Sequence, residues 1–167
     1  TSGTGLSTAQ GAELVSPSVV AITTEQVVYS QWSWYGQSQV ESGAGSGVII
    51  SSDGYILTCA HVVSGASNIT VSIGDKDYPA TLVGEDTTSD IAVVKVDATG
   101  LTPATVGNSD NLKVGESVMA VGNPLGELGG TVTSGIVSAL NRSVSIQGSS
   151  SVNTMSLIQM DASVRDR

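Results

Sequence analysis

The sequence is poor in the residues from which many functional sites are built. Its 167 residues contain no phenylalanine, one histidine, one cysteine and six lysine or arginine residues, against 15 aspartate or glutamate residues. The formal net charge of −9 argues against binding nucleic acid or an anionic membrane surface through a basic patch. A single cysteine excludes an internal disulfide. No stretch approaches the ~20 apolar residues that a membrane-spanning helix needs.

Metal and cofactor sites have few candidate residues. One histidine and one cysteine leave little for zinc, and the scattered acidic residues form no calcium loop. Segment 122–126 contains two glycines, but no Gly-Lys-Ser/Thr follows it, as a phosphate-binding loop would require. Cys59 stands close to His61, yet two residues of one strand so close in sequence do not usually meet in attack geometry. We expect Cys59 to be a small buried strand residue, and no cofactor or metal.

What the sequence has in quantity favours strands and turns. Apolar residues make up 40%, charged residues 13%, and there are 20 glycines beside many Val, Ser and Thr residues. This mixture is typical of an all-β fold whose core is built from Val, Ile and Leu. The length suffices for one domain or two small lobes.

The stretch 45–63 contains the only histidine and reads as a β-hairpin. Two short β-branched runs flank Ser-Ser-Asp-Gly, in which Asp53-Gly54 is a strong hairpin signal. The hairpin would place His61 just beyond a strand end. A lone histidine is usually a satisfied structural group, so His61 needs a partner before catalysis is favoured.

Asp90 is that partner in the sequence. It stands at the start of a strongly apolar strand, 91–96, where an aspartate alone would be read as a turn residue. A histidine that acts as a general base needs a carboxylate to fix its tautomer, and that carboxylate is usually distant in sequence but close in the fold. We therefore expect His61 and Asp90 to lie within hydrogen-bond reach.

Six motifs, in order along residues 7–162, resemble the HtrA/Deg family of trypsin-like serine proteases. They are Gly-Ser-Gly-Val-Ile-Ile, Leu-Thr-Cys-Ala-His-Val-Val, Ser-Asp-Ile-Ala-Val-Val-Lys-Val, Val-Gly-Asn-Pro-Leu-Gly, Thr-Val-Thr-Ser-Gly-Ile-Val-Ser-Ala and Leu-Ile-Gln-Met-Asp-Ala. The resemblance implies a double β-barrel of the chymotrypsin type. It also implies that His61 is the general base and Asp90 its orienting carboxylate.

The same resemblance implies a nucleophile that residues 1–167 do not contain. In the family, a Gly-Asn-Ser-Gly-Gly-type segment follows the Asp-Ala pair within a few positions, whereas here Asp161-Ala162 is followed by Ser-Val-Arg-Asp-Arg. Ser163 comes too early to match the family nucleophile. We expect a lead and short helix over 1–17, a first barrel lobe over 18–106, and a partial second lobe over 107–167 that lacks the nucleophile segment.

Local signals give two further groups of expectations. Ser7 and Gln10 predict a capping box at the start of a short helix that ends before Pro17. Segment 29–46, which is polar and aromatic, and segment 142–154, which is small and polar, are predicted to be loops. The second of these resembles in position a loop that orders when family members are active.

Three hypotheses for function follow. The first is a serine endopeptidase of the protein-quality-control type, inactive over residues 1–167 because the nucleophile is absent; the second is a non-catalytic module that binds extended peptides at strand edges. The third is a truncated or disrupted gene product, with residues 164–167 of foreign origin. The resemblance implies unfolded or extended polypeptide substrates and an extracytoplasmic location, periplasmic or at the cell surface.

The expected partial second lobe has consequences for partners. Unpaired strand edges and an uncovered apolar sheet favour pairing with another chain, so we expect a homo-oligomer or another partner to complete this lobe. The chain begins at Thr1 rather than at methionine, which favours an excised piece and leaves open a membrane anchor in a missing N-terminal segment. A peptide-binding PDZ domain after the protease domain is also left open.

Overall fold

The structure, a computed structural model, describes residues 5–29, 38–123, 130–147 and 152–164. The chain divides into two compact units. The barrel unit comprises Pro17–Ala104 and Gly122–Gly130, and the sheet unit comprises Thr1–Ser16, Thr105–Val121 and Thr131–Arg167. One closed barrel and one partial sheet are present, so the expected all-β fold of the trypsin-like double-barrel type is confirmed. The lobe boundaries at 18–106 and 107–167 stay a prediction.

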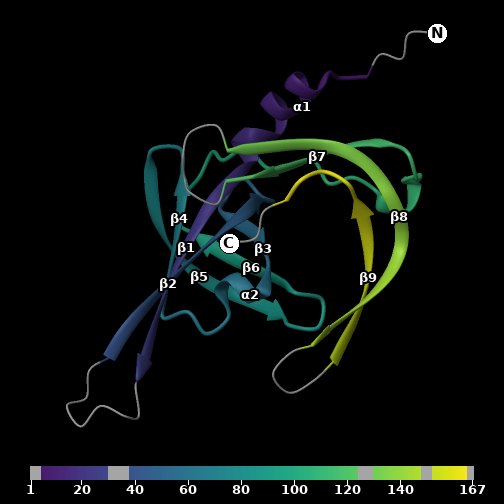
Figure 1. Ribbon diagram of the computed structural model, residues 1–167. Helices are drawn as coiled ribbons and strands as arrows, with labels where there is room; N and C mark the ends of the chain where they lie inside the picture. The colour runs from purple at the N-terminus through teal and green to yellow at the C-terminus, as the bar shows by residue number, and fades with distance from the viewer. Residues whose placement is uncertain (1–4, 30–37, 124–129, 148–151, 165–167) are drawn as a thin grey trace. The chain divides into compact units, whose positions relative to one another are not determined.

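The barrel unit is a closed six-stranded antiparallel barrel (Figure 1). Around the barrel the order of strands is β1-β2-β3-β6-β5-β4. Their bounds are β1 Val19–Tyr29, β2 Ser38–Ile49, β3 Tyr55–Thr58, β4 Asn68–Ile73, β5 Lys76–Asp86 and β6 Ile91–Val96, with a short helix α2 at Ala60–Val63. Closure leaves no free edge in this ring, and each strand can turn alternate side chains toward the interior.

Small β-branched residues fill the barrel. The largest fully buried side chains include Ile22, Ile49, Ile56, Val71 and Val94. In β3 burial alternates residue by residue, and β6 shows the same alternation from its second residue onward. The buried core cluster of the barrel consists of Ile, Val and Ala. The prediction of a Val, Ile and Leu core is therefore confirmed for Val and Ile, whereas Leu57 and Leu82 are each 37% exposed.

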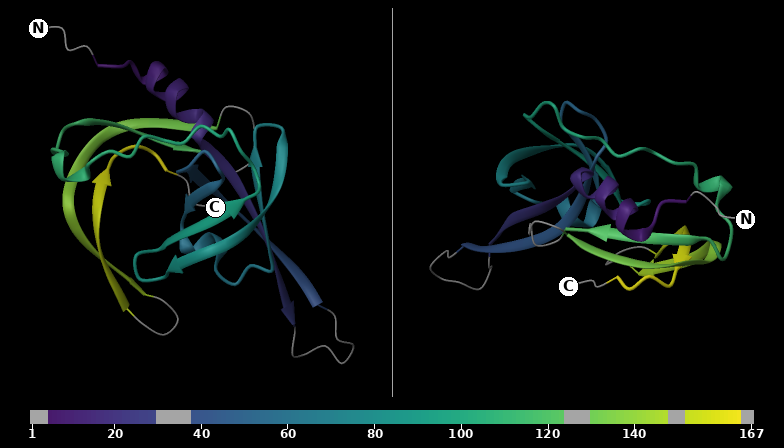
Figure 2. Two further views of the ribbon diagram at one scale, coloured as in Figure 1. Left: turned by 180° about the vertical axis from the view of Figure 1, so that it is seen from behind. Right: turned by 90° about the horizontal axis from the view of Figure 1, so that it is seen from above.

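Strands β1 and β2 continue beyond the barrel as a two-stranded ribbon. β1 pairs with β4 only as far as Glu25, whereas its pairing with β2 runs on to Tyr29 opposite Ser38. Figure 2 shows this ribbon extending away from the other barrel strands. The predicted loop over 29–46 is therefore wrong for Tyr29, which ends β1, and for residues 38–46, which belong to β2. Residues 30–37 lie outside the described residues. The glycines and serines here belong to a strand whose partner supplies the hydrogen bonds.

The sheet unit contains a three-stranded sheet of order β7-β8-β9. Its strands are β7 Ser117–Gly122, β8 Thr131–Gln147 and β9 Val152–Met160, and a 3-10 turn, η2, lies at Ser109–Asn111. Strands β8 and β9 pair from Gln147 opposite Val152 back to Val137 opposite Met160. The predicted loop over 142–154 is therefore wrong except for 148–151, which lie outside the described residues.

The predicted capping box begins helix α1, Thr8–Val15, of the sheet unit. The Ser7 hydroxyl accepts a hydrogen bond from the Gln10 backbone N–H at 3.2 Å, and the Gln10 side-chain oxygen accepts one from the Ser7 N–H at 2.9 Å. A 3-10 turn, η1 at Ser16–Ser18, follows and contains the predicted terminating proline. The helix prediction is confirmed.

Burial differs between the two units. After residue 104, the buried apolar residues within the described part of the chain are Val137 and Ala162. Ile136, Leu157, Ile158 and Met160 are each between 38% and 47% exposed. Because few of its apolar side chains are buried, this sheet has limited hydrophobic stabilisation of its own.

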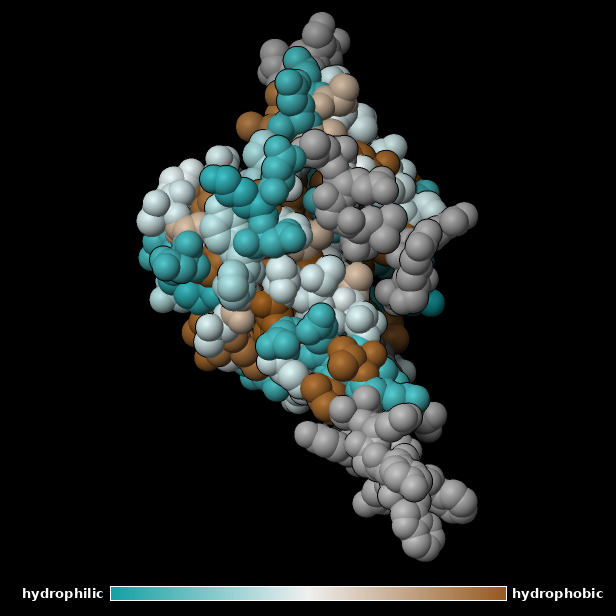
Figure 3. All heavy atoms as spheres, turned by 90° about the vertical axis from the view of Figure 1, so that its left-hand side faces the viewer, coloured by the Kyte–Doolittle hydropathy of each residue, from teal (hydrophilic) through white to brown (hydrophobic). Residues whose placement is uncertain are grey.

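The described surface gives two further facts. On the face shown in Figure 3, hydrophobic residues lie in separate groups between hydrophilic ones. Among the helices that the structure describes, none has the length and apolarity needed to cross a membrane.

The turn between β2 and β3 yields a testable prediction at Gly54. This residue has φ +110°, and an added Cβ would clash with the backbone oxygen of Val96, whose N–H donates to the Gly54 carbonyl at 3.0 Å. We expect Gly54→Ala to lower the free energy of unfolding by more than Gly74→Ala. At Gly74, φ is +59° and no atom lies within 4 Å of an added Cβ, so only the backbone cost of about 1–2 kcal/mol applies.

Chemical denaturation measures the free energy of unfolding of the two variants and checks this difference. Hydrogen exchange of the Val96 amide reports separately on the contact with residue 54. Equal losses would show that the close approach of Val96 does not constrain residue 54.

Candidate active site

Helix α2 places His61 at the surface of the barrel. Ala60 and Val63 are both 1% exposed and belong to the barrel core, so they fix this single turn of helix against the strands. His61 lies between them in sequence but on the outer side, with a side chain that is 65% exposed. Helix α2 thus anchors the histidine through its two buried neighbours.

A tight turn before β6 presents Asp90. The Asp86 carboxylate accepts hydrogen bonds from the Thr88 backbone N–H at 3.0 Å and the Ser89 hydroxyl at 2.7 Å. The Ser89 hydroxyl, followed by the Thr88 N–H, lowers the pKa of Asp86 below its ordinary value. Asp90 itself has φ +56°, a conformation that aspartate and asparagine tolerate better than most residues. The turn aims Asp90 at α2 before the strand begins.

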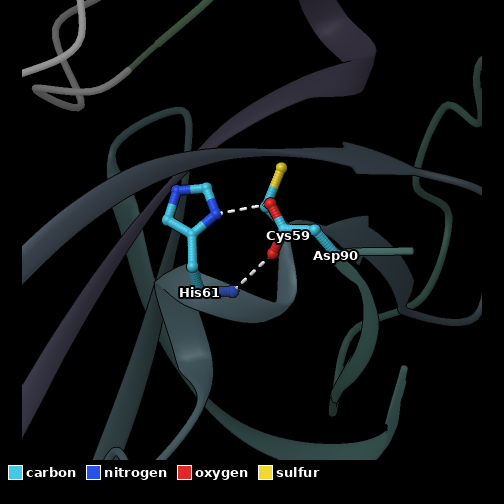
Figure 4. A group of neighbouring side chains, drawn as sticks. All are labelled: Cys59, His61 and Asp90. Carbon is cyan, nitrogen blue, oxygen red and sulfur yellow. Dashed lines mark hydrogen bonds and ion pairs between the residues drawn. The ribbon is translucent and has the colours of Figure 1, made fainter. Parts of the chain in front are cut away.

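Asp90 holds both the backbone and the ring of His61. One carboxylate oxygen accepts from the His61 backbone N–H at 2.8 Å, and the other lies 2.6 Å from the ring nitrogen Nδ1. The Asp90 backbone oxygen accepts from the Ala60 N–H at 3.1 Å. Figure 4 shows the ring facing the carboxylate through Nδ1, with its second nitrogen turned away. The expected approach of His61 to Asp90 is present.

This arrangement selects one form of the imidazole. An ionised carboxylate only accepts hydrogen bonds, so the Nδ1 beside it carries the proton of a neutral ring. The other nitrogen, Nε2, then has a free lone pair. Such a ring can take a proton from a hydroxyl group that lies within hydrogen-bond reach of Nε2.

Comparison with known proteins places this geometry in a family. The trypsin-like peptidase domain family matches residues 45–166, which include both His61 and Asp90. The chain belongs to the trypsin-like peptidase family. Its resemblance to the HtrA/Deg proteases is confirmed by the relatives and solved structures that it matches.

Three relatives illustrate the similarity. A probable periplasmic serine endoprotease DegP-like of Halomonas elongata is 54% identical over 65% of this chain and 23% of its own length. The serine protease Do-like HtrA of Bacillus subtilis is 42% identical over 91% of this chain and 36% of its own length. The serine protease PepD of Mycobacterium tuberculosis is 44% identical over 93% of this chain and 33% of its own length. The chain therefore spans between 23% and 36% of the length of these relatives.

Solved structures agree with this assignment. A variant of the HtrA-type protease AlgW with a decapeptide is 34% identical, with a TM-score of 0.80, over 95% of this chain and 52% of that one. AlgW with a tripeptide is 36% identical, with a TM-score of 0.76, over 95% of this chain and 47% of the AlgW chain.

One expectation about the site of this trypsin-like peptidase chain is wrong. Cys59 is exposed, not buried. In β3, Tyr55 and Leu57 are exposed and Ile56 and Thr58 are buried, and this alternation turns the next position, residue 59, outward. The Sγ atom of Cys59 lies within 4.8 Å of a ring nitrogen of His61 and within 4.8 Å of a carboxylate oxygen of Asp90. From the sequence, Cys59 was expected close to His61, but its closeness to Asp90 was not predicted.

Ser163, the other serine considered, lies in the sheet unit after β9 and is exposed. Sequence reasoning also missed Asp86, whose only signal is its place a few residues before Asp90 in a Thr-Thr-Ser turn.

Proposed function

We propose that this chain supplies the general base and its orienting carboxylate to a serine endopeptidase of the HtrA/Deg type. The observation that carries the proposal is the pair of hydrogen bonds between Asp90 and His61. The Asp90 carboxylate lies 2.8 Å from the His61 backbone nitrogen and 2.6 Å from Nδ1. This pair of hydrogen bonds fixes the ring and leaves Nε2 directed away from the carboxylate.

In the proposed reaction a serine hydroxyl attacks the peptide carbonyl while Nε2 of His61 takes its proton. The Asp90 carboxylate stabilises the imidazolium that forms, and His61 then returns the proton to the leaving amine. Backbone N–H groups around the nucleophile would stabilise the oxyanion. Residues 1–167 contain no Gly-Asn-Ser-Gly-Gly-type segment, so we infer that this polypeptide by itself is inactive.

The proposed substrates are extended polypeptide segments outside the cytoplasm. The similar HtrA-type protease AlgW has been solved with a tripeptide and with a decapeptide. Relatives from Halomonas and Pseudomonas are named periplasmic endoproteases. We further propose that a second copy or another partner covers the sheet unit, because its β8–β9 sheet exposes several large apolar side chains.

A second candidate function is a non-catalytic peptide-binding module. It is favoured by β9, which is an edge strand of the described three-stranded sheet and could pair with an extended peptide. This function requires neither His61 nor Asp90, and so it leaves their geometry unexplained.

A gain-of-activity experiment tests the proposed function. We expect the 167-residue polypeptide to cleave no casein and to take up no serine-directed fluorophosphonate probe. A chimera that continues from Asp161 into the corresponding downstream protease segment of the Bacillus subtilis HtrA relative is expected to do both. His61→Ala should lower casein cleavage by the chimera about 10⁶-fold, because the triad acts as a unit.

Ser163→Ala in the unextended polypeptide is the matched control and should change nothing. Labelling of the unextended polypeptide that disappears in Ser163→Ala would overturn the inferred inactivity. A folded chimera whose cleavage survives His61→Ala would overturn the role of the histidine.

A further inference from the structure

Three side chains with different ligand chemistry meet beside α2. The thiol of Cys59, the imidazole of His61 and the carboxylate of Asp90 each offer one atom, and these atoms all lie within 4.8 Å of one another. Figure 4 shows the sulfur next to the carboxylate and the ring. Cys59 is exposed, and the side chains of His61 and Asp90 are 65% and 30% exposed. An ion from solvent can therefore reach all three.

The ligand set suits Zn²⁺ better than other common divalent ions. Sulfur and imidazole nitrogen favour zinc over magnesium and calcium, which take oxygen ligands, and zinc also accepts a carboxylate. In a tetrahedral zinc site with ordinary bond lengths, neighbouring ligand atoms are roughly 3.3–3.6 Å apart. A spread of up to 4.8 Å would close to that range if the exposed side chains of Cys59 and His61 rotated toward Asp90.

We propose that Cys59, His61 and Asp90 form a surface Zn²⁺ site, with water as the fourth ligand. On binding, the Cys59 thiol gives up its proton to the buffer. The 2.6 Å separation of Nδ1 and the Asp90 oxygen is too short for two ligands of one tetrahedral zinc ion, so this hydrogen bond opens. Nδ1 then binds the metal, and the ring proton is carried on Nε2.

Zinc at this site would remove the group that the proposed peptidase needs. With its proton on Nε2 and its Nδ1 lone pair on zinc, His61 has no free lone pair with which to accept a proton. This inhibitory consequence rests on the proposed function, whereas zinc binding itself does not. The proposal revises the expectation that the chain has no metal site. That expectation was based on one histidine and one cysteine, whereas the fold brings Asp90 beside them as a third ligand.

Metal titration of the 167-residue polypeptide tests the site without any activity assay. We expect one Zn²⁺ per chain by calorimetry, and Co²⁺ is expected to give the intense near-ultraviolet absorption of a cobalt–thiolate bond. Cys59→Ser should abolish that absorption and weaken Zn²⁺ binding at least about tenfold, and His61→Ala should weaken it to a similar degree. Asp75→Asn, which alters an exposed carboxylate in the turn between β4 and β5, should leave both signals unchanged.

Because His61 is the only histidine, its imidazole ¹⁵N signals report the ligand atom directly. Zinc is expected to shift Nδ1 and to leave a proton on Nε2. Equal Zn²⁺ affinity in the original chain and Cys59→Ser, or weakening by Asp75→Asn as large as by Cys59→Ser, would overturn the proposal in favour of diffuse binding to an acidic surface. Should a variant not fold, a missing cobalt–thiolate band or an unshifted Nδ1 in the original chain would overturn it equally.

Discussion

Asp90→Asn is expected to lower kcat/KM for casein about 10⁴-fold in the chimera that carries a nucleophile segment. The asparagine can keep the positive φ of residue 90 and can still accept from the His61 backbone N–H. Its amide nitrogen would face Nδ1 as a donor, and this favours the tautomer whose proton is on Nε2. A ring in that form cannot take the serine proton, so activity falls although the fold is retained.

Asp75→Asn is the matched control, since it removes the same charge from an exposed turn of the barrel unit. Activity of that variant should stay within about twofold of the parent chimera, because surface substitutions of this kind have small effects. Imidazole ¹⁵N shifts of the 167-residue chain give an independent readout, with the proton expected on Nδ1 in the original sequence and on Nε2 in Asp90→Asn. Unchanged kcat/KM in Asp90→Asn would exclude Asp90 as the orienting carboxylate.

The fold could be predicted where short-range chemistry decides the structure. The Ser7–Gln10 capping box and the Asp53-Gly54 turn each depend on hydrogen bonds and backbone preferences within a few residues, and both are present. Segments 38–46 and 142–147 were predicted to be loops because Gly, Ser and polar residues are poor strand formers. In each case pairing with a neighbouring strand, β1 or β9, overrides that weak preference.

The candidate site could be predicted as far as the pair His61 and Asp90 and its close approach. The motifs indicated His61 and Asp90, but not that one carboxylate would hold both a backbone nitrogen and a ring nitrogen. That detail depends on the positive φ of Asp90 and on the Asp86 hydrogen bonds that shape the turn before it. The position of Cys59 beside the pair depends on where β3 ends, and strand ends are the least certain part of a sequence-based assignment.

The barrel that carries the pair should depend strongly on Ile56. This residue is fully buried in β3, opposite Ile49 and Val94, and an added Cβ at Gly47 would meet its Cγ2 at 2.7 Å. Ile56→Ala therefore removes about three carbon atoms, two methyl groups and one methylene, from a tightly packed site that has little room to collapse. We expect a loss of about 2–5 kcal/mol in the free energy of unfolding of the barrel unit.

The next residue provides the control, because Leu57 belongs to the same strand but points outward and is 37% exposed. Leu57→Ala removes a comparable apolar volume and should cost well under half as much. Native-state hydrogen exchange at the Val94 amide in increasing urea measures the barrel unit separately from the sheet unit. Equal losses for Ile56→Ala and Leu57→Ala would contradict the inward packing of Ile56, whereas the expected difference would confirm that Ile56 belongs to the tightly packed core of the barrel that carries His61 and Asp90.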